Sequence, residues 1–328
     1  MSESVTVSVV APMHNEVGNV AEFCRRVRET LDSMKLGYEI ILVDDGSTDG
    51  TREALRRIVQ TEPRAKVVLL TRNFGQCPAL YAGLQECVGE WVVVMDSDLQ
   101  HAPEEIPLLV NKAREGNYDL VSGWRQARRE GFWTRRMPSL IANYAIRKAT
   151  GCPAHDMAGF KCIRGDVARE LRLFPGQHRF LPALVYLQGG SVAEVPISAP
   201  PRLHGKSHYK LPRMFDVMLD IISLRFQAAH QTRPLQFLGR VAFFLVAAGG
   251  IVLAWMIYDK FVNHVLMGTR PLLPLAVLSI LLGVICLVLG FVAEMVAKIH
   301  FEVHSAKPYR VAEVLTGKAL KGGAEAKQ

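Results

Sequence analysis

Apolar residues form short strand-like runs and longer helical stripes along the first part of the chain. The strand-like runs cover residues 5–11, 38–43, 66–71, 91–95 and 118–124. Between the first two runs, apolar residues recur at helical spacing as Val20, Phe23, Val27 and Leu31. Strands that alternate with helices at this spacing predict βαβ units on a mostly parallel sheet, a Rossmann-like α/β fold.

The run at 91–95 is apolar throughout and ends abruptly in polar residues. The absence of alternation is typical of a strand that helices cover on both faces. Asp96, Asp98 and Gln100 follow it directly. Ligands of parallel sheets bind at the carboxyl ends of the strands, and two nearby carboxylates can converge on one hard cation such as Mg²⁺ or Mn²⁺. Alternatively, one Asp caps the helix expected near Pro103 and the other is a solvated turn residue.

The loops after the first and second strands also carry acids. Glu16 follows the first strand, and Asp44 and Asp45 follow the second. Asp at a strand end commonly binds ribose or base, whereas a metal-held pair binds a diphosphate, so the three loops together outline a nucleotide-diphosphate site. A turn in which Thr51 caps the next helix explains the second loop equally well. The first loop lacks GxGxxG, so a dehydrogenase-type dinucleotide fold is not expected.

Two later stretches contain no charged side chain, residues 241–258 and 271–293. Both are long enough to cross a bilayer, and their close spacing indicates a transmembrane hairpin at about 238–258 and 271–294 rather than buried core helices. No signal peptide precedes Val5, so the preceding domain is expected to stay in the cytoplasm. Lysine and arginine are more frequent after the second stretch than between the two, which predicts that both chain ends are cytoplasmic.

Four regions are therefore expected. They are a cytoplasmic catalytic domain at 1–210, interfacial amphipathic helices at 211–235, the transmembrane hairpin at 236–297 and a cytoplasmic tail at 298–328. The formal charge of +8 raises the question of nucleic-acid binding, but no recognition motif is present. Anionic membrane lipids and phosphorylated substrates explain the basic residues better. A homo-oligomer is compatible with this organisation.

Four motifs resemble those of a known family. In order, they read PMHNE, EIILVDDGSTDGT, RNFGQCPALYAGL and VVVMDSDLQHAPEE. They are similar to the opening of family-2 inverting glycosyltransferases with the GT-A fold, and more narrowly to polyprenyl-phosphate sugar synthases of the dolichol-phosphate mannose synthase type. The resemblance covers most of residues 5–226. It implies a donor site and a metal site, the latter at Asp96, Asp98 and Gln100. By this resemblance, the residues expected to bind the donor at these motifs are Pro12, His14, Glu16, Asp44, Asp45, Asp96 and Ser97.

A basic stretch after the fifth strand suits a lipid phosphate. Arg135, Ser139 and Asn143 share one helical face with apolar residues around it, as expected for a helix at a membrane surface. The resemblance assigns Arg125, Arg135 and Ser139 to the acceptor phosphate. A solvated basic face is the other interpretation of this stretch.

Two further segments match the resembled family. Asp156 opens DMAGFKCI, which resembles a segment of the catalytic pocket, although a turn or cap residue is an equal alternative. With Asp98 it completes the expected catalytic set. PPRLHGKSHY resembles a donor-closing loop and implicates Arg202 and Lys206, but His208 stands where Lys is usual.

The sequence thus predicts transfer of a sugar from a UDP- or GDP-linked donor to polyprenyl (undecaprenyl) phosphate at the bacterial inner membrane. The HRFLPALV segment resembles branches that serve lipopolysaccharide and lipid A modification. One alternative is a transferase that acts on a sugar hydroxyl, but QxxRW is absent and two spans are too few for a polymer channel. Another is a catalytically silent membrane scaffold, against which the intact acids in three loops argue.

Overall fold

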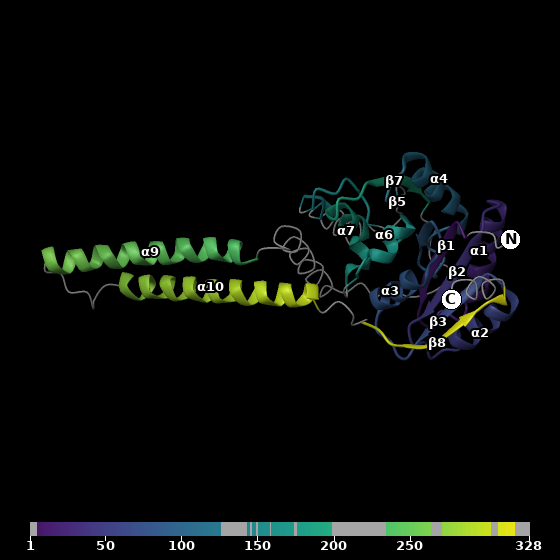
Figure 1. Ribbon diagram of the computed structural model, residues 1–328, viewed down its shortest axis with the longest axis horizontal. Coiled ribbons are helices and arrows are strands. Elements are labelled where there is room, and N and C mark those ends of the chain that lie inside the picture. Colours follow the sequence, from purple (N-terminus) through teal and green to yellow (C-terminus); the bar gives the residue numbers. More distant parts are fainter. Residues whose placement is uncertain are drawn as a thin grey trace. The chain divides into compact units, whose positions relative to one another are not determined.

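The computed structural model describes residues 5–125, 143–144, 146–148, 150–157, 159–173, 176–198, 234–263, 271–302 and 308–318. Strands and helices alternate in the first part of the chain, as predicted (Figure 1). The strands are β1 (Val7–Met13), β2 (Tyr38–Asp44), β3 (Ala65–Leu70), β4 (Trp91–Val94), β5 (Leu120–Arg125), β6 (Lys161–Arg164), β7 (Val192–Ile197) and β8 (Val311–Thr316).

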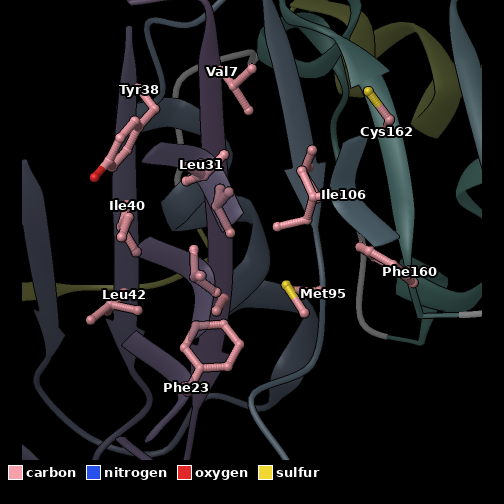
Figure 2. Close-up of a cluster of buried hydrophobic side chains, with 14 of the residues drawn as sticks. Val7, Phe23, Leu31, Tyr38, Ile40, Leu42, Met95, Ile106, Phe160 and Cys162 are labelled. Carbon is pink, nitrogen blue, oxygen red and sulfur yellow. The ribbon is translucent and has the colours of Figure 1, made fainter. Parts of the chain in front are cut away.

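The α-helices of the same unit are α1 (Val20–Ser33), α2 (Thr51–Thr61), α3 (Gln76–Glu86), α4 (Ile106–Gly116), α6 (Gly165–Glu170) and α7 (Leu181–Leu187). Two 3₁₀ turns, η1 (Pro103–Glu105) and η3 (Gln177–Phe180), precede α4 and α7. One buried cluster packs α1, α2 and α4 against one face of the sheet (Figure 2). A second cluster packs α3, α6 and α7 against the other face, so the strands are covered on both sides.

The strands form one mixed sheet in the order β7-β5-β6-β4-β1-β2-β3-β8. β1 lies in the middle and is parallel to both β2 and β4, while β6 is antiparallel to β4 and β5. Register brings the strand ends together, because Met13 pairs with Asp44 and Val10 pairs with Val94. The loops that follow β1, β2 and β4 therefore leave the sheet at the same edge.

β1 continues through Pro12, where the sequence analysis ended the strand. A proline lacks the N–H that a central strand normally donates, so it is tolerated only where no ladder partner needs that group. The β4 ladder ends at the Val10–Val94 pair, and beyond it β1 is paired with β2 only. Pro12 sits in this one-sided stretch, at the entrance of the site.

The segment expected as a separate tail contributes a strand to the sheet. β8 lies antiparallel beside β3, with Lys66 opposite Thr316 (Figure 1). Tyr309, just before β8, is buried and meets the ring of Tyr81 edge-on at 5.8 Å. The six-residue strand has no neighbouring element in the chain to pair with, which is why its pattern alone did not reveal it.

Residues Arg225–Ala306 form a second compact unit. It contains α9 (Pro234–Val262) and α10 (Leu272–Glu302), which pack against each other. Within them, Leu238–Val262 and Leu272–Ala293 are long and apolar enough to cross a membrane. Their contact is close, since a methyl group on Gly283 would lie 2.7 Å from Val246. Small residues that let helix backbones approach are typical of membrane helix pairs.

Candidate active site

A pocket opens at the edge where the strand ends meet. Its cavity volume is about 380 Å³, within the usual range for small-molecule sites. Many of the donor-site residues expected from the sequence line it, namely Pro12, His14, Glu16, Asp45, Asp96 and Ser97, together with Asp98 of the expected metal site. The other lining residues are Met13, Asn73, Gly75 and Gln76, which were not among the expected site residues. Three of these four belong to the RNFGQ motif after β3, so the position of this motif at a strand end could have indicated them.

Asp45 joins the loops after β2 and β3. Its carboxylate accepts hydrogen bonds from the backbone N–H groups of Phe74 at 2.7 Å and Gly75 at 2.8 Å. The two loops touch so closely at Gly46 that a methyl group there would lie 2.3 Å from the backbone of Arg72. Gly46 also has a positive φ of 69°, which side chains disfavour. The DDG motif therefore builds one wall of the pocket.

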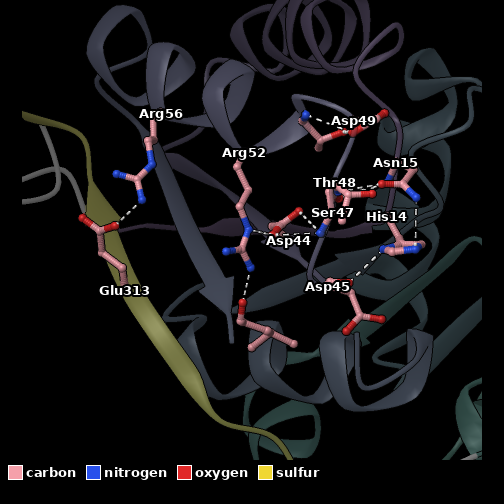
Figure 3. A network of polar contacts seen from close by, with 12 residues as sticks. His14, Asn15, Asp44, Asp45, Ser47, Thr48, Asp49, Arg52, Arg56 and Glu313 are labelled. Carbon is pink, nitrogen blue, oxygen red and sulfur yellow. Dashed lines mark hydrogen bonds and ion pairs between the residues drawn. The ribbon is translucent and has the colours of Figure 1, made fainter. Parts of the chain in front are cut away.

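Asp44 has a different environment from its neighbour, although the sequence placed both in the donor site. Its side chain is fully buried and pairs with Nε of Arg52 at 2.6 Å (Figure 3). It also accepts the backbone N–H of Ser47 at 3.2 Å. Arg52 in turn donates to the carbonyl of Leu70. Asp44 does not line the pocket and ties β2 to α2 and β3 instead.

The histidine of the first loop, His14, is oriented by hydrogen bonds at both ring nitrogens. Its Nδ1 lies 2.9 Å from the carbonyl oxygen of Asp45, and its Nε2 lies 3.0 Å from the side-chain amide of Asn73. A carbonyl only accepts, so Nδ1 of His14 carries the proton and Nε2 accepts from Asn73. Glu16 accepts a hydrogen bond from the Asn19 amide at 2.6 Å. Hydrogen bonds within the protein therefore fix the side chains of this loop before any substrate binds.

The DSDLQ turn after β4 presents its acids on a strained backbone. Leu99 has a φ of 58°, an uncommon conformation for a branched residue that recurs at functional sites. Asp96 accepts from the Gln76 amide at 2.8 Å, and the Ser97 hydroxyl donates to the carbonyl of Pro12 at 3.2 Å. The Gln100 backbone N–H and side-chain amide both donate to Asp98.

The donor set of this turn fits a hard divalent cation. Asp96 and Asp98 both line the pocket and offer carboxylate oxygens, and Gln100 adds an amide beside Asp98. Among the described residues, no three His, Cys, Asp or Glu side chains gather closely enough to hold a metal by themselves. Mg²⁺ usually takes one or two protein carboxylates and completes its shell with substrate phosphates and water. Two acids in an open pocket match that pattern.

Asp156 and Arg125 form an ion pair at the end of β5, which is separated from β4 by β6 in the sheet. Arg125, the last residue of β5, donates through Nε to Asp156 at 3.0 Å. The backbone N–H of Asp156 donates to Glu194 on β7 at 3.0 Å. Asp156 is 4 % exposed. The contact lets the Asp156 carboxylate orient the guanidinium of Arg125.

Two buried residues near Asp96 were missed by the sequence analysis. His101 lies against Phe160 with its Nε2 4.0 Å from Asp96, and burial lowers its pKa to about 4. Lys161, the first residue of β6, is fully buried, and burial lowers its pKa to about 8. Burial also raises the pKa of Asp96, against the opposing charges of Lys161 and Arg125. Nothing in the sequence pattern of FKC marks the lysine as buried.

The remaining site predictions fall outside the described residues. They are the acceptor residues Arg135 and Ser139, the donor-loop residues Arg202 and Lys206, and residues 211–233 of the interfacial helices expected at 211–235.

Comparison with known proteins gives a consistent result. The model of "Glycosyl transferase family 2" matches residues 8–171. The dodecaprenyl-phosphate galacturonate synthase of Rhizobium johnstonii is 35% identical over 316 residues, 95% of this chain and 94% of that protein. An undecaprenyl-phosphate 4-deoxy-4-formamido-L-arabinose transferase of Edwardsiella ictaluri is 33% identical over 314 residues, 94% of each chain.

The fold is also found among solved structures. The glucosyl-3-phosphoglycerate synthase of Mycobacterium tuberculosis, in complex with Mn²⁺ and UDP-glucose, aligns with a TM-score of 0.52 at 21% identity, over 68% of this chain and 79% of that one. Mannosyl-3-phosphoglycerate synthase of Rubrobacter xylanophilus aligns with a TM-score of 0.55 at 18% identity, over 68% and 74%. The α/β fold and the resemblance noted from the motifs are thus confirmed.

Proposed function

Because the chain belongs to glycosyl transferase family 2, we propose that it transfers a sugar from a nucleotide-diphosphate sugar to a polyprenyl phosphate, with inversion at the anomeric carbon. The observation that carries the proposal is the pocket in which acids from three strand ends meet. Relatives at 35% and 33% identity over nearly the whole chain are named for transfer to dodecaprenyl and undecaprenyl phosphate, which supports the acceptor class.

On the donor side, the loops after β1 and β2 would hold the nucleotide, and the turn after β4 would hold Mg²⁺ or Mn²⁺. A bound cation supplies positive charge that stabilises the leaving diphosphate. Asp96 and Asp98, with Gln100 beside them, are the residues proposed to hold it. Arg202 and Lys206 remain proposed contacts of the donor phosphates, on the strength of the motif resemblance.

On the acceptor side, Arg125 would bind the lipid phosphate, together with Arg135 and Ser139. A phosphate oxygen forms the new bond to the anomeric carbon while the bond from that carbon to the donor diphosphate breaks. The nucleoside diphosphate leaves with the bonding electrons. A phosphate monoester has a second pKa of about 6, so at neutral pH it is mostly the dianion. Its oxygen is then already nucleophilic and needs little help from a base.

The proposed location is the cytoplasmic face of a bacterial inner membrane. α9 and α10 supply two candidate spans, and β8, which follows them, pairs with β3 of the unit that precedes them. A chain that returns to the same sheet must cross the membrane an even number of times. This supports a hairpin with the catalytic unit and β8 on one side, as the lysine asymmetry predicts.

The sugar and the nucleotide are to be identified by assay. Purified full-length protein in nanodiscs is incubated with undecaprenyl phosphate and a panel of UDP- and GDP-sugars that includes uronic acids and amino sugars. Mass spectrometry should detect a lipid-phosphate sugar with one donor, and NMR of that product should show the inverted anomer. Transfer to an alkyl sugar carrying a free hydroxyl, with none to the lipid phosphate, would overturn the proposal.

A further inference from the structure

Lys161 lies between the two halves of the proposed site. In the sheet it pairs with Val94 of β4 on one side and with Ser122 of β5 on the other. Asp96 comes two residues after Val94, and Arg125 comes three residues after Ser122. Lys161 is therefore placed between the turn that carries the metal-site acids and the strand end that carries the Arg125–Asp156 pair.

The chain just before Lys161 touches the metal-site turn directly. A methyl group on Gly159 would lie 2.6 Å from the Oδ2 atom of Asp96 and 3.2 Å from His101. A side chain at that point would displace the Asp96 carboxylate. The start of β6 and the DSDLQ turn are thus held in contact, which keeps the lysine close to the acids.

Lys161 is a buried cation at the start of β6. Only 1 % of the residue is exposed. Burial opposes its charged form most strongly and the charge of Arg125 adds to this, whereas Asp96 and Asp156 favour the charged form. Burying a charge is costly unless opposite charges compensate it. The negative charges that compensate the ammonium here are the carboxylates of Asp96, on one side of the site, and Asp156, on the other.

We propose that Lys161 is a positioning residue whose ammonium is the shared counter-charge of Asp96 on the donor side and Asp156 on the acceptor side. The identity of the two sides rests on the proposed function. A fixed cation beside the metal-site acids repels a divalent ion, so it weakens metal binding until the donor diphosphate adds its negative charge. The metal then binds strongly only together with the nucleotide sugar.

The first test measures Mn²⁺ binding to the full-length protein without substrates, by electron paramagnetic resonance. Lys161→Met removes the charge and keeps a long side chain. It should bind Mn²⁺ at least about fivefold more tightly than the unmodified protein. Lys66→Met is the matched control, because Lys66 is also a strand lysine but lies on β3, between β2 and β8, and pairs with Glu86 at 3.3 Å.

The sign of this effect separates the proposal from a purely structural role. A lysine that only fills space in the core would, once replaced, leave Mn²⁺ affinity unchanged or reduce it through local damage. Unchanged or weaker binding by Lys161→Met would therefore overturn the proposal. With UDP present, the gain should shrink, because the diphosphate then compensates the lysine in the unmodified protein.

The second test is a double-mutant cycle on thermal unfolding, which needs neither metal nor activity. Lys161→Met is combined with Asp156→Asn or with Asp96→Asn. In each double variant, the loss of Tm should be smaller than the sum of the losses in the two single variants, by at least about 2 °C, because the two residues share an interaction. Lys161→Met with Asp45→Asn is the control and should be additive. Additivity in all three pairs rejects the shared counter-charge.

The two tests also separate this inference from the proposed function. If the unmodified protein binds no Mn²⁺ even with UDP, the metal assignment of the proposed function fails, and the unfolding cycle alone decides on Lys161. If Mn²⁺ binds and depends on Asp98 while the cycle is additive, the metal site stands and the role of Lys161 is rejected. Should Lys161→Met alone not fold, recovery of folding in the doubly neutral variant with Asp156→Asn supports the coupling, and failure to recover rejects it.

Discussion

Asp44 and Asp45 are adjacent in the chain and have opposite surroundings. Asp44 ends β2 and Asp45 follows it directly, and successive side chains along an extended backbone point to opposite sides, so one carboxylate lies against Arg52 and the other lines the pocket. The same alternation explains why the motif DDG contributes both a structural acid and a site acid. At this scale, function depends on which side of the backbone a residue occupies.

The pair of acids gives a matched comparison. Asp44→Asn should lower the free energy of unfolding by about 1–3 kcal/mol, because it weakens the buried contact with Arg52. Asp45→Asn should lower the affinity for the nucleotide more than Asp44→Asn does. Thermal unfolding and nucleotide binding, measured on both variants, check this. A larger loss of nucleotide affinity in Asp44→Asn would return that residue to the donor site.

Asp98 is expected to be essential for turnover. Asp98→Asn removes a charged oxygen from the proposed metal site and should reduce kcat by several orders of magnitude, with little change in Tm. The assay is the transfer reaction with and without added Mg²⁺ or Mn²⁺. Full activity in the presence of a chelator would contradict the metal site itself.

Asp156 is expected to matter less than Asp98 at alkaline pH. At pH 8 the lipid phosphate is almost entirely the dianion, so loss of the carboxylate mainly disturbs Arg125. As the pH falls towards about 6, part of the acceptor carries a proton, and the deficit of Asp156→Asn should grow. The rates of both variants are compared across this range. A deficit as large as that of Asp98→Asn and independent of pH would show that Asp156 has another, essential role.

At the scale of elements, β8 completes the edge of the catalytic sheet. Its ladder covers β3, which is apolar except for Lys66, and Tyr309 packs into the core beside Tyr81. An uncovered edge strand exposes unpaired backbone groups and promotes aggregation. The chain after the two long helices is therefore part of the catalytic unit, not an appendage.

Truncation after Ala306 tests this role. Removing β8 and Tyr309 should lower the free energy of unfolding by about 2 kcal/mol or more, because even one large buried side chain contributes that much. Glu313→Gln is the control. It breaks only the exposed ion pair with Arg56 and should cost less than about 1 kcal/mol. Thermal unfolding in detergent compares the two. Equal unfolding temperatures for the truncated and complete chains would show that β8 is dispensable.

At the scale of the whole molecule, the return of the chain to its first sheet constrains the topology. If α9 and α10 form a hairpin, the loop between them faces the periplasm and β8 faces the cytoplasm. An impermeant thiol reagent applied to intact cells permeabilised only at the outer membrane should label a cysteine introduced at Asn263 and should miss one at Lys318. The chain without an added cysteine is the control. The reverse labelling pattern would place the catalytic unit outside the cytoplasm.

Local patterns in the sequence determined the alternation of strands and helices, the two apolar helices and the acids at the strand ends. These features are readable because each depends on residues close together in the chain: strand-like apolar runs, an uncharged stretch, or a motif directly after a strand. They were sufficient to predict the α/β fold and the pocket lined by His14, Asp45 and Asp98.

Only the tertiary structure decided which polar residues are buried and with what. Arg125 meets Asp156 across 31 residues of chain, β8 meets β3 across more than two hundred, and Lys161 is buried because β6 inserts antiparallel between β4 and β5. Charge, burial and pairing at such positions arise from segments brought together by the sheet. No periodicity within one segment contains that information, since the partner that gives each residue its role lies elsewhere in the chain.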